Sequence, residues 1–506
     1  MELFHIPERR PEELLAVADG GRRVLYGELF AAGEGLARAG CRRELVFVLC
    51  ENTAGTLLGY LGCLLCGAVA LLLDAHIAPE LLGGLAETYR PAFFLVPRDL
   101  PAQTRVRLPQ AAPALELRES VLLSNGGRGP ALHPELALLL ATSGSTGSPK
   151  LVRLSGKNLQ SNAGAIVEYL GLTPEERPIT TLPMNYSYGM SVVNSHVQAG
   201  AAVLLTRRGV LERGFWDRAA GEGATSLAGV PYTYQMFRRL GLASMKLPRL
   251  RYLTQAGGGL PPELHREFAA WAAGTGRRFY VMYGQTEAGP RMGYLPPERA
   301  EEKCGAMGIA IPGGRFWLED GDGRVADGPG ASGELVYQGE NVAMGYAETA
   351  DGLRLGDEWG GVLRTGDMAR RDDDGIYYIT GRKKRFVKLY GSRVGLDGAE
   401  RLLSARFPEA EFACVGRDGL LSVYVSPPGG GGGGGGGGLP GGPDPPAPGG
   451  VPGVPGSGHP QDGGGENLLR PAERGRFMGR GWEGTGKLWK NRAGRGMTAA
   501  PGCYFS

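Results

Sequence analysis

The chain has 506 residues, of which 42% are hydrophobic and 21% charged, and its net charge at pH 7 is +3. This length allows two or three domains with a sizeable core. The nearly neutral balance argues against a large nucleic-acid-binding face, so we expect no nucleic-acid partner. The N-terminus lacks a basic region followed by an apolar core, and we therefore expect no signal peptide.

Seven cysteines are scattered along the chain. Cys63 and Cys66 form the only C-x-x-C pair and lie in an apolar, helix-like run, so we favour core packing over a zinc or redox site. This usage is typical of reduced thiols, and we expect a cytoplasmic protein. The longest apolar stretch, 56–73, contains glycines and ends at Asp74. We interpret it as a buried helix leading into a strand, and we expect no membrane span.

The region 20–135 alternates strand-like and helical segments. A strand is predicted at 44–50, a helix from about 56 to 66 and a strand at 68–73. Strand, helix and strand at this spacing indicate a parallel sheet and an α/β architecture. The same rhythm predicts further strands at 201–206, 225–230, 251–256 and 278–283.

Two short apolar strands predicted at 136–141 and 151–154 enclose the segment Thr142-Ser-Gly-Ser-Thr-Gly-Ser-Pro-Lys150. Its glycines let the backbone approach a ligand, and clustered N–H groups, hydroxyls and a lysine suit phosphates. A Ser/Gly-rich surface turn is the alternative. A P-loop NTPase is not favoured, because G-x-x-x-x-G-K-[ST] is absent and a strand follows the lysine. The candidate phosphate-binding residues are Thr142, Ser143, Gly144, Ser145, Thr146, Gly147 and Lys150.

From about Cys304 the pattern changes to strands separated by Gly/Asp turns, which indicates antiparallel hairpins. The charged run 382–385 follows, and we interpret it as a hinge at Lys384; a solvated loop would have the same composition. These hairpin strands are predicted at 315–318, 333–337 and 375–380.

The segment 427–506 is of low complexity and contains an unbroken run of glycines at 429–438. Such a composition cannot bury enough apolar surface to offset the entropy of ordering, so we expect a disordered Gly/Pro-rich tail. We interpret it as an aberrant C-terminus, of the kind that a reading-frame error produces, rather than as an evolved linker.

The phosphate-loop segment resembles the signature of the adenylate-forming (AMP-binding) superfamily, which comprises acyl-CoA synthetases, luciferases and peptide-synthetase adenylation domains. The resemblance covers about residues 20–425. It implies an α/β fold with a large N-terminal domain (1–381) of parallel-rich sheets, helices and a β-hairpin subdomain. A small, apparently truncated α+β C-terminal domain (382–426) would follow. The other matching motifs are Tyr283-Gly-Gln-Thr-Glu287, Leu363-Arg-Thr-Gly-Asp367, Gly381-Arg382, and the glycine turn after Gln255.

The resemblance implies a role for each matched residue. Tyr283 would stack on adenine, Thr286 would contact the α-phosphate, Glu287 would help to hold Mg²⁺ and Asp367 would bind both ribose hydroxyls. An aromatic face suits a purine, and carboxylates suit hard cations and pairs of donors. The further nucleotide-binding candidates are Gly257, Gly258, Gly284, Tyr378 and Arg382, with core packing as the alternative for Tyr378. The candidate catalytic residues are Thr142, Lys150, Thr286, Glu287 and Arg382.

The acid pocket is predicted in the segment 182–190, which follows the phosphate loop. Tyr186 and Tyr188 are candidate lining residues together with Val230 and Gly258, although core packing explains Val230 nearly as well. Relatives that activate amino acids place an aspartate in this segment to pair with the substrate ammonium. Because this chain has no carboxylate there, an uncharged or hydroxylated acid is favoured.

The resemblance implies that ATP and Mg²⁺ activate a small carboxylic acid, which is then transferred to a thiol, with CoA as the second substrate. An acyl carrier protein is the alternative acceptor. A third possibility is a nucleotide-binding pseudo-enzyme, because relatives use a lysine in a C-terminal G-K segment for adenylation. Here only Gly484-Thr-Gly-Lys487 is similar to that segment.

Overall fold

The computed structural model describes most of the chain before residue 427. The described residues are 3–105, 108, 113–141, 150–326, 328–383, 386–389, 392–407, 410–417 and 420–426. The candidates Thr142, Ser143, Gly144, Ser145, Thr146 and Gly147, the hinge residue Lys384 and Lys487 lie outside them. The chain divides into two compact units, Met1–Thr380 and Gly381–Ser506.

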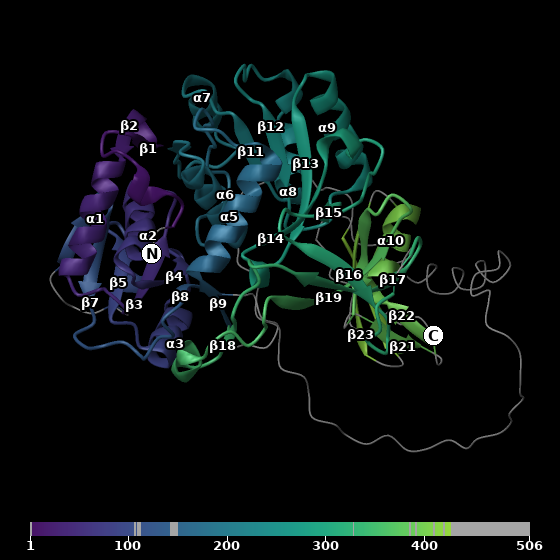
Figure 1. Cartoon of the computed structure of the whole chain (residues 1–506). Helices are drawn as coiled ribbons and strands as arrows, with labels where there is room; N and C mark the ends of the chain where they lie inside the picture. The colour runs from purple at the N-terminus through teal and green to yellow at the C-terminus, as the bar shows by residue number, and fades with distance from the viewer. Residues whose placement is uncertain are drawn as a thin grey trace, which may run out of the picture. The chain divides into compact units, whose positions relative to one another are not determined.

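An eight-stranded sheet forms the first part of the larger unit, with the strand order β18-β9-β8-β4-β3-β5-β7-β6 (Figure 1). Its centre is β3 (Leu45–Cys50), which pairs in parallel with β4 (Val69–Asp74) and β5 (Phe93–Pro97). All of β3 is buried, as expected for a parallel strand covered on both faces. The other strands are β6 (Pro113–Leu117), β7 (Ser120–Ser124), β8 (Leu136–Ala141), β9 (Leu151–Ser155) and β18 (Gly345–Ala347).

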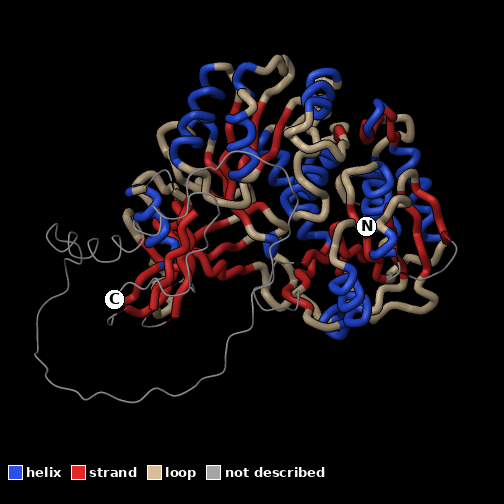
Figure 2. Tube along the Cα trace, turned by 180° about the vertical axis from the view of Figure 1, so that it is seen from behind, coloured by secondary structure: helices blue, strands red, loops and turns tan. Residues whose placement is uncertain are grey.

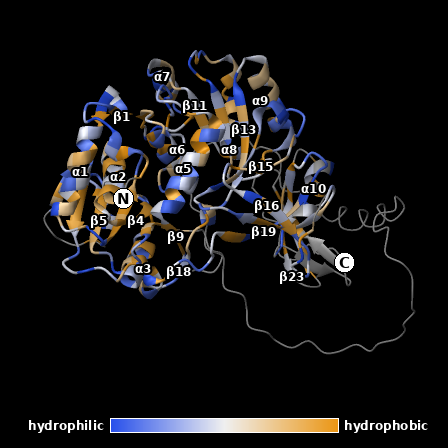
Figure 3. Ribbon diagram, viewed as in Figure 1, coloured by the Kyte–Doolittle hydropathy of each residue, from blue (hydrophilic) through white to orange (hydrophobic). Residues whose placement is uncertain are grey.

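The crossover from β3 to β4 is helix α2 (Ala54–Cys66), which confirms the strand, helix and strand predicted between 44 and 73. Thr53 caps the start of the helix, because its side chain accepts a hydrogen bond from the Thr56 N–H. The helix packs against α1 (Tyr26–Arg38). Figure 3 shows the hydrophobic colour of α2 and of the neighbouring strands. Two further helices belong to this region, α3 (Pro79–Tyr89) and α4 (Ala102–Arg105).

Both cysteines of the C-x-x-C pair lie on α2 and are buried. Burial raises the pKa of the Cys63 and Cys66 thiols, which makes them poor metal ligands and poor nucleophiles at neutral pH. The prediction of core packing is therefore confirmed. Within the described part of the chain, no cluster of His, Cys, Asp and Glu side chains could hold a metal ion, and no helix is long and apolar enough to cross a membrane.

A second sheet of the larger unit has the strand order β11-β12-β13-β14-β15. The first three strands are parallel and confirm the strands predicted at 225–230, 251–256 and 278–283. β14 pairs antiparallel with β13, and β15 pairs antiparallel with β14. The strands are β11 (Ser226–Gly229), β12 (Tyr252–Gln255), β13 (Arg278–Gly284), β14 (Arg291–Leu295) and β15 (Ile309–Ala310). The helices between β9 and β13 in the chain are α5 (Gly156–Leu170), α6 (Ser187–Gln198), α7 (Arg213–Gly221), α8 (Pro231–Arg239) and α9 (Pro262–Gly274).

Helix α5 lies between these two sheets (Figures 1 and 2). Leu159 and Ala163 pack into the core of the first sheet, whereas Ile166 and Leu170 pack with residues of the second. A capping box at Ser155 fixes the start of the helix directly after β9. Helix α5 therefore packs on both sheets, and it positions the segment after the phosphate loop relative to the sheet that carries the Tyr283 motif.

The strand predicted at 201–206 is much shorter in the structure. Only Val203–Leu204 (β10) forms a ladder, in parallel with β1 (Leu14–Ala18), which also pairs with β2 (Arg22–Leu25). All residues from 201 to 206 are buried, so the apolar run reflects burial rather than a long ladder. Short 3-10 helices lie in the connections, at Ile6–Glu8, Asp19–Gly21, Leu242–Ser244, Thr286–Ala288, Pro297–Arg299 and Ala350–Arg354.

The predicted hairpin region forms a four-stranded sheet in the order β16-β17-β19-β20, with antiparallel pairing of β16, β17 and β19. The Leu363–Asp367 motif lies inside β19 and not in an isolated turn. Glu334 pairs with Met368, and Val336 pairs with Arg364. Residues 365–367 of β19 therefore lie opposite the single residue Leu335, so the strand contains a bulge at this point. The strands are β16 (Arg315–Glu319), β17 (Ser332–Gln338), β19 (Val362–Arg371) and β20 (Tyr377–Arg382).

The smaller unit has an α+β composition. The strands β21 and β22 form one antiparallel pair and β23 and β24 form another, and α10 lies between the pairs in the chain. The bounds are β21 (Phe386–Leu389), β22 (Ser392–Gly395), α10 (Leu396–Arg406), β23 (Glu411–Arg417) and β24 (Leu420–Ser426). Together the two units confirm the mixed α/β fold class.

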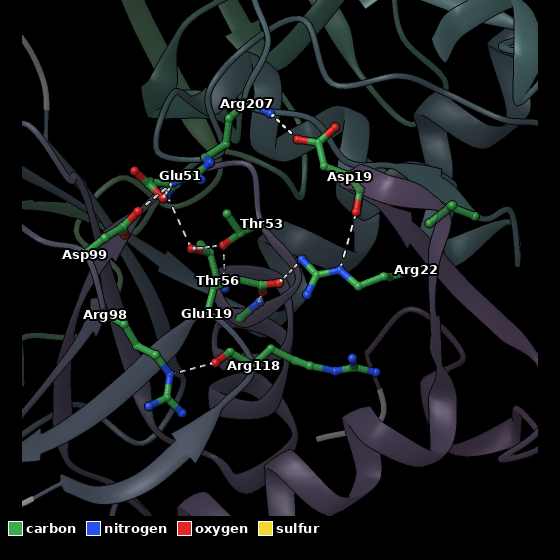
Figure 4. A network of polar contacts seen from close by, with 12 residues as sticks. Asp19, Arg22, Glu51, Thr53, Thr56, Arg98, Asp99, Arg118, Glu119 and Arg207 are labelled. Carbon is green, nitrogen blue, oxygen red and sulfur yellow. Dashed lines mark hydrogen bonds and ion pairs between the residues drawn. The ribbon is translucent and has the colours of Figure 1, made fainter. Parts of the chain in front are cut away.

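The carboxyl ends of β3 and β5 carry a network of polar side chains (Figure 4). The Arg207 guanidinium donates to Glu51 and Asp99 at 3.1 Å each, and its backbone N–H donates to Asp19 at 3.2 Å. Ligands of open α/β sheets bind at this edge of the strands. These carboxylates are already paired with Arg207, whereas the predicted nucleotide residues Gly257 and Tyr283 lie at the corresponding edge of the second sheet.

His196 on α6 is buried and makes the folded protein sensitive to acid. Its Nδ1 donates to the Val192 carbonyl at 2.7 Å, and its Nε2 accepts from the Tyr252 hydroxyl at 2.9 Å. Burial lowers its pKa from the ordinary value of 6.5 to about 4. Between these values the unfolded chain binds a proton that the folded chain does not, so stability falls as the pH falls.

We therefore expect the free energy of unfolding to be lower at pH 5 than at pH 7 by about 2 kcal/mol through this residue. Urea denaturation of wild type and His196→Gln between pH 4 and 7 measures it, and the variant should have the shallower pH dependence. His76→Gln, an exposed histidine, is the matched control. Equal slopes in all three proteins would show that His196 does not titrate in this range.

Candidate active site

Tyr283 at the end of β13 and Asp367 in the bulge of β19 form the first cluster of predicted residues. The Tyr283 hydroxyl donates to Asp367 Oδ2 at 2.6 Å, and Gln285 Nε2 donates to the same oxygen at 2.9 Å. Burial and the negative charge of Asp367 raise the pKa of Tyr283 well above its ordinary value, so the phenol remains a donor. The aromatic ring and the carboxylate that sequence reasoning assigned to adenine and ribose are thus brought together.

The bulge is what directs Asp367 toward Tyr283. Gly366 has a φ of +71°, a left-handed conformation that favours glycine, and Thr365 Oγ1 donates to the Leu335 carbonyl at 2.7 Å. The Asp367 N–H donates back to Thr365 Oγ1 at 3.1 Å. Asp367 is only 6% exposed, and a buried carboxylate needs such fixed donors. Its acceptor oxygens suit the paired hydroxyls of a ribose.

The predicted glycine turn follows β12. Gln255 is buried, and its Nε2 donates to the Gly258 carbonyl at 2.8 Å, which shapes the turn. A Cβ on Gly257 would lie 2.5 Å from the Tyr186 hydroxyl and 3.1 Å from Val230 Cγ1. A side chain at 257 would therefore clash, and the turn brings Tyr186 and Val230 together as the acid-pocket prediction requires.

Thr286 and Glu287 lie on the short 3-10 helix that follows β13. Thr286 Oγ1 is 3.1 Å from Ser187 Oγ at the start of α6, between the two pocket tyrosines in the sequence. The Tyr346 hydroxyl donates to Glu287 Oε1 at 2.7 Å. The Tyr346 ring also lies 5.6 Å from Lys150 Nζ, which pairs with Glu348 Oε1 at 2.7 Å. The predicted metal ligand and the phosphate-loop lysine therefore share one neighbour.

This arrangement fits Mg²⁺ at Glu287. Among the described residues, the carboxylate of Glu287 has a neutral donor, Tyr346, and no cationic side chain within ion-pair distance. A carboxylate with an uncompensated charge is the ligand that Mg²⁺ prefers when it also binds phosphates. A cavity of about 600 Å³ opens beside Tyr346. Its lining includes three carboxylates, Glu348, Asp351 and Glu358, against one arginine, Arg354, which is a poor composition for a phosphate site.

Other predicted residues have different surroundings. Gly284 is explained by packing, because a Cβ there would lie 1.8 Å from the Pro290 carbonyl oxygen. Tyr378 donates to Asp372 at 3.3 Å, and the Arg370 guanidinium lies 3.9 Å from the centre of its ring. These contacts of Tyr378 are within its own hairpin. Arg382 is exposed at the start of the smaller unit.

Tyr188 is fully buried, and its hydroxyl donates to Thr254 at 2.8 Å. The guanidinium of Arg291 on β14 lies 4.0 Å from the centre of the Tyr188 ring. Sequence reasoning missed Arg291 and also missed Gln285, Ser187 and Tyr346. Gln285 occupies the variable position of Y-G-x-T-E, and Arg291 is a charged residue beginning an otherwise apolar strand. An unexplained charge so close to the motif is the signal that would have found Arg291.

Comparison with known proteins shows the family of the chain. The family model described as "AMP-binding enzyme" matches residues 3–347, more than half of the chain. An indoleacetate–CoA ligase from Aromatoleum aromaticum is 30% identical over 420 residues, 78% of this chain and 81% of that protein. A sulfoacetate–CoA ligase from Cupriavidus necator is 32% identical over 391 residues, 72% of each protein.

Solved structures show the same fold. The o-succinylbenzoate CoA synthetase (MenE) from Bacillus subtilis, in complex with its acyl-adenylate intermediate, superposes with a TM-score of 0.69 at 22% identity. The match covers 83% of this chain and 87% of that chain. The same synthetase with ATP and magnesium ion gives a TM-score of 0.66. The chain therefore belongs to the AMP-binding enzyme family and is an AMP-forming acid–thiol ligase of the acyl-CoA synthetase type.

Proposed function

We propose that this protein converts a small carboxylic acid into its acyl adenylate and transfers the acyl group to CoA. The hydrogen-bonded cluster of Tyr283, Gln285 and Asp367 carries the proposal, because it combines an aromatic face with a positioned carboxylate. The named CoA ligases among the relatives support CoA as the acceptor. Their acids differ in chemistry, so they do not specify the acid of this chain.

In the first step, a carboxylate oxygen of the acid attacks the α-phosphorus of ATP, and the bond to the bridging oxygen breaks to release pyrophosphate. Asp367 would hold the ribose, and the Tyr283 ring would lie against the adenine. Thr286 would donate to the α-phosphate, and Lys150, with the loop residues 142–147, would bind the departing phosphates. Glu287 would hold Mg²⁺, which would neutralise part of the negative charge on the phosphates of ATP. Such transfers depend on positioning and charge stabilisation.

In the second step, the CoA thiolate attacks the acyl carbon and the carbon–oxygen bond to AMP breaks. We further propose a small domain at 382–426 that moves about a hinge at Lys384. An acyl carrier protein remains the alternative acceptor, because a nonribosomal peptide synthetase of Gibberella zeae is 28% identical over 300 residues. A nucleotide-binding pseudo-enzyme remains the alternative to turnover, because Lys487 is the only candidate for the C-terminal lysine.

The test is release of pyrophosphate from Mg·ATP across a panel of acids, first with hydroxylamine to trap the acyl adenylate and then with CoA. We expect acyl hydroxamate with one class of acid, and acyl-CoA plus AMP when CoA is added. Hydroxamate without acyl-CoA, together with acylation of a phosphopantetheinylated carrier protein, would replace CoA by that acceptor. Binding of ATP without pyrophosphate release for any acid would indicate the pseudo-enzyme.

A further inference from the structure

Arg291 is a buried cation that has no acidic partner among the residues that the structure describes. It is the first residue of β14 and is 3% exposed, and its Nε is buried with no hydrogen-bond partner. Among the described residues, no carboxylate forms an ion pair with it. Burying a guanidinium without a counter-charge is costly, so proteins retain such a group where something else supplies the negative charge.

One tyrosine ring, that of Tyr188, lies over the guanidinium, and Tyr169 and Tyr186 belong to the same hydrophobic cluster as that ring. The central carbon of the guanidinium lies 4.0 Å from the centre of the Tyr188 ring, and its positive charge opposes the burial that raises the pKa of Tyr169 and Tyr186. The Tyr169 hydroxyl itself donates to Met282 Sδ at 3.1 Å. A ring stacked on the flat face of a guanidinium stabilises the cation and leaves the N–H groups at its edge available. The Tyr188 ring thus holds Arg291 in place without neutralising it.

Tyr186 and Tyr188 belong to the predicted acid pocket. Tyr186 packs against the glycine turn at Gly257, and Ser187, next to it, is 3.1 Å from Thr286. The pocket candidates are therefore continuous with the residue assigned to the α-phosphate. In the chain, Arg291 comes only four residues after Glu287. The buried cation lies among the residues that would surround the acid.

We propose that Arg291 binds a second anionic group of the acid substrate, a distal carboxylate or sulfonate, so that the substrate class is a small acid with two negative charges. The inference rests on the proposed function, and it replaces the uncharged or hydroxylated acid expected from the segment 182–190. A guanidinium binds such a planar or tripodal anion through two parallel N–H donors. The reacting carboxylate is the poorer partner, because a bidentate guanidinium would occupy the oxygen that must attack phosphorus.

The test compares acids that differ only by a methyl group in place of the second anion: succinate with butyrate, terephthalate with 4-methylbenzoate, and sulfoacetate with propionate. We expect wild type to prefer the dianion in at least one pair, by about tenfold or more in kcat/KM for pyrophosphate release. Arg291→Gln should lose about 100-fold for that dianion and little or nothing for its methyl partner. Arg291→Lys, which keeps the charge but not the fork, should fall between the two.

Arg278→Gln is the matched control. The Arg278 guanidinium also lies over tyrosine rings of the same hydrophobic cluster, at 5.6 Å from Tyr252 and 5.7 Å from Tyr280. Arg278 is the first residue of β13, whereas Arg291 pairs with the last residue of that strand, and the Arg278 side chain donates to the Leu170 carbonyl. This variant should retain the wild-type preference for the dianion. Equal loss of both acids of each pair in Arg291→Gln, or a wild-type preference for the methyl acid in all three pairs, would overturn the inference.

Calorimetric binding of the same acids in the presence of a nonhydrolysable ATP analogue separates this inference from the proposed function. Dianion binding that weakens in Arg291→Gln and not in Arg278→Gln supports Arg291 even if wild type releases no pyrophosphate with any acid. Conversely, turnover of the methyl acids with no effect of Arg291→Gln would leave the ligase function standing and remove the role of Arg291. The wild-type comparison within each pair needs no variant, so it still tests the dianion preference if Arg291→Gln folds poorly.

Discussion

Asp367→Asn should lower kcat/KM for ATP by about 100- to 1000-fold, because the loss of hydrogen bonds to a charged acceptor removes several kcal/mol of binding. The amide would replace one acceptor oxygen by an NH₂ donor. Turned toward the cluster, that donor would face the Tyr283 hydroxyl and the Gln285 amide, which both donate to Asp367 Oδ2. Turned the other way, it would face the ribose with a donor in place of an acceptor, so either orientation of the amide loses a hydrogen bond.

Steady-state pyrophosphate release at varied ATP, together with calorimetric titration of ATP, measures this effect. Asp374→Asn is the matched control, because Asp374 is an exposed carboxylate paired with Arg299 and Lys303 on the turn that joins β19 to β20. We expect the control to bind ATP as wild type does. An unchanged ATP affinity in Asp367→Asn would remove the ribose role assigned to this residue.

Glu287→Gln is expected to reduce turnover by about 1000-fold and to raise the Mg²⁺ concentration needed for half-maximal rate. The amide keeps the size of the side chain and accepts the hydrogen bond from Tyr346, but it removes the charge that attracts the cation. The effect should thus appear in kcat and in the Mg²⁺ dependence more than in the affinity for the acid.

A Mg²⁺ titration of pyrophosphate release is the measurement, with Glu340→Gln as the control. Glu340 is an exposed glutamate whose side chain pairs with Lys157. Tyr346→Phe removes only the hydrogen bond to Glu287, and we expect it to cost less than about tenfold. A Mg²⁺ dependence in Glu287→Gln that matches wild type would place the metal on other residues.

The sequence alone determined the elements whose signal is local. Continuous apolar runs such as 44–50 and 136–141 became buried strands, and the helix from 54 to 66 has a Thr cap at its start and a glycine directly after it. The Y-G-x-T-E and R-T-G-D motifs predicted the nucleotide residues, because these motifs require fixed residue types at fixed spacing.

Tertiary structure decided everything that depends on distant partners. The bulge of β19 directs Asp367 to Tyr283, 84 residues away in the chain, and no local pattern specifies that pairing. The apolar run at 201–206 forms only a two-residue ladder, because burial and strand pairing are separate properties. In the sequence Arg291 is an isolated charge, and only folding buries it beside the Tyr188 ring. A charged side chain that is buried requires a counter-charge, and the whole fold decides which side chains are buried.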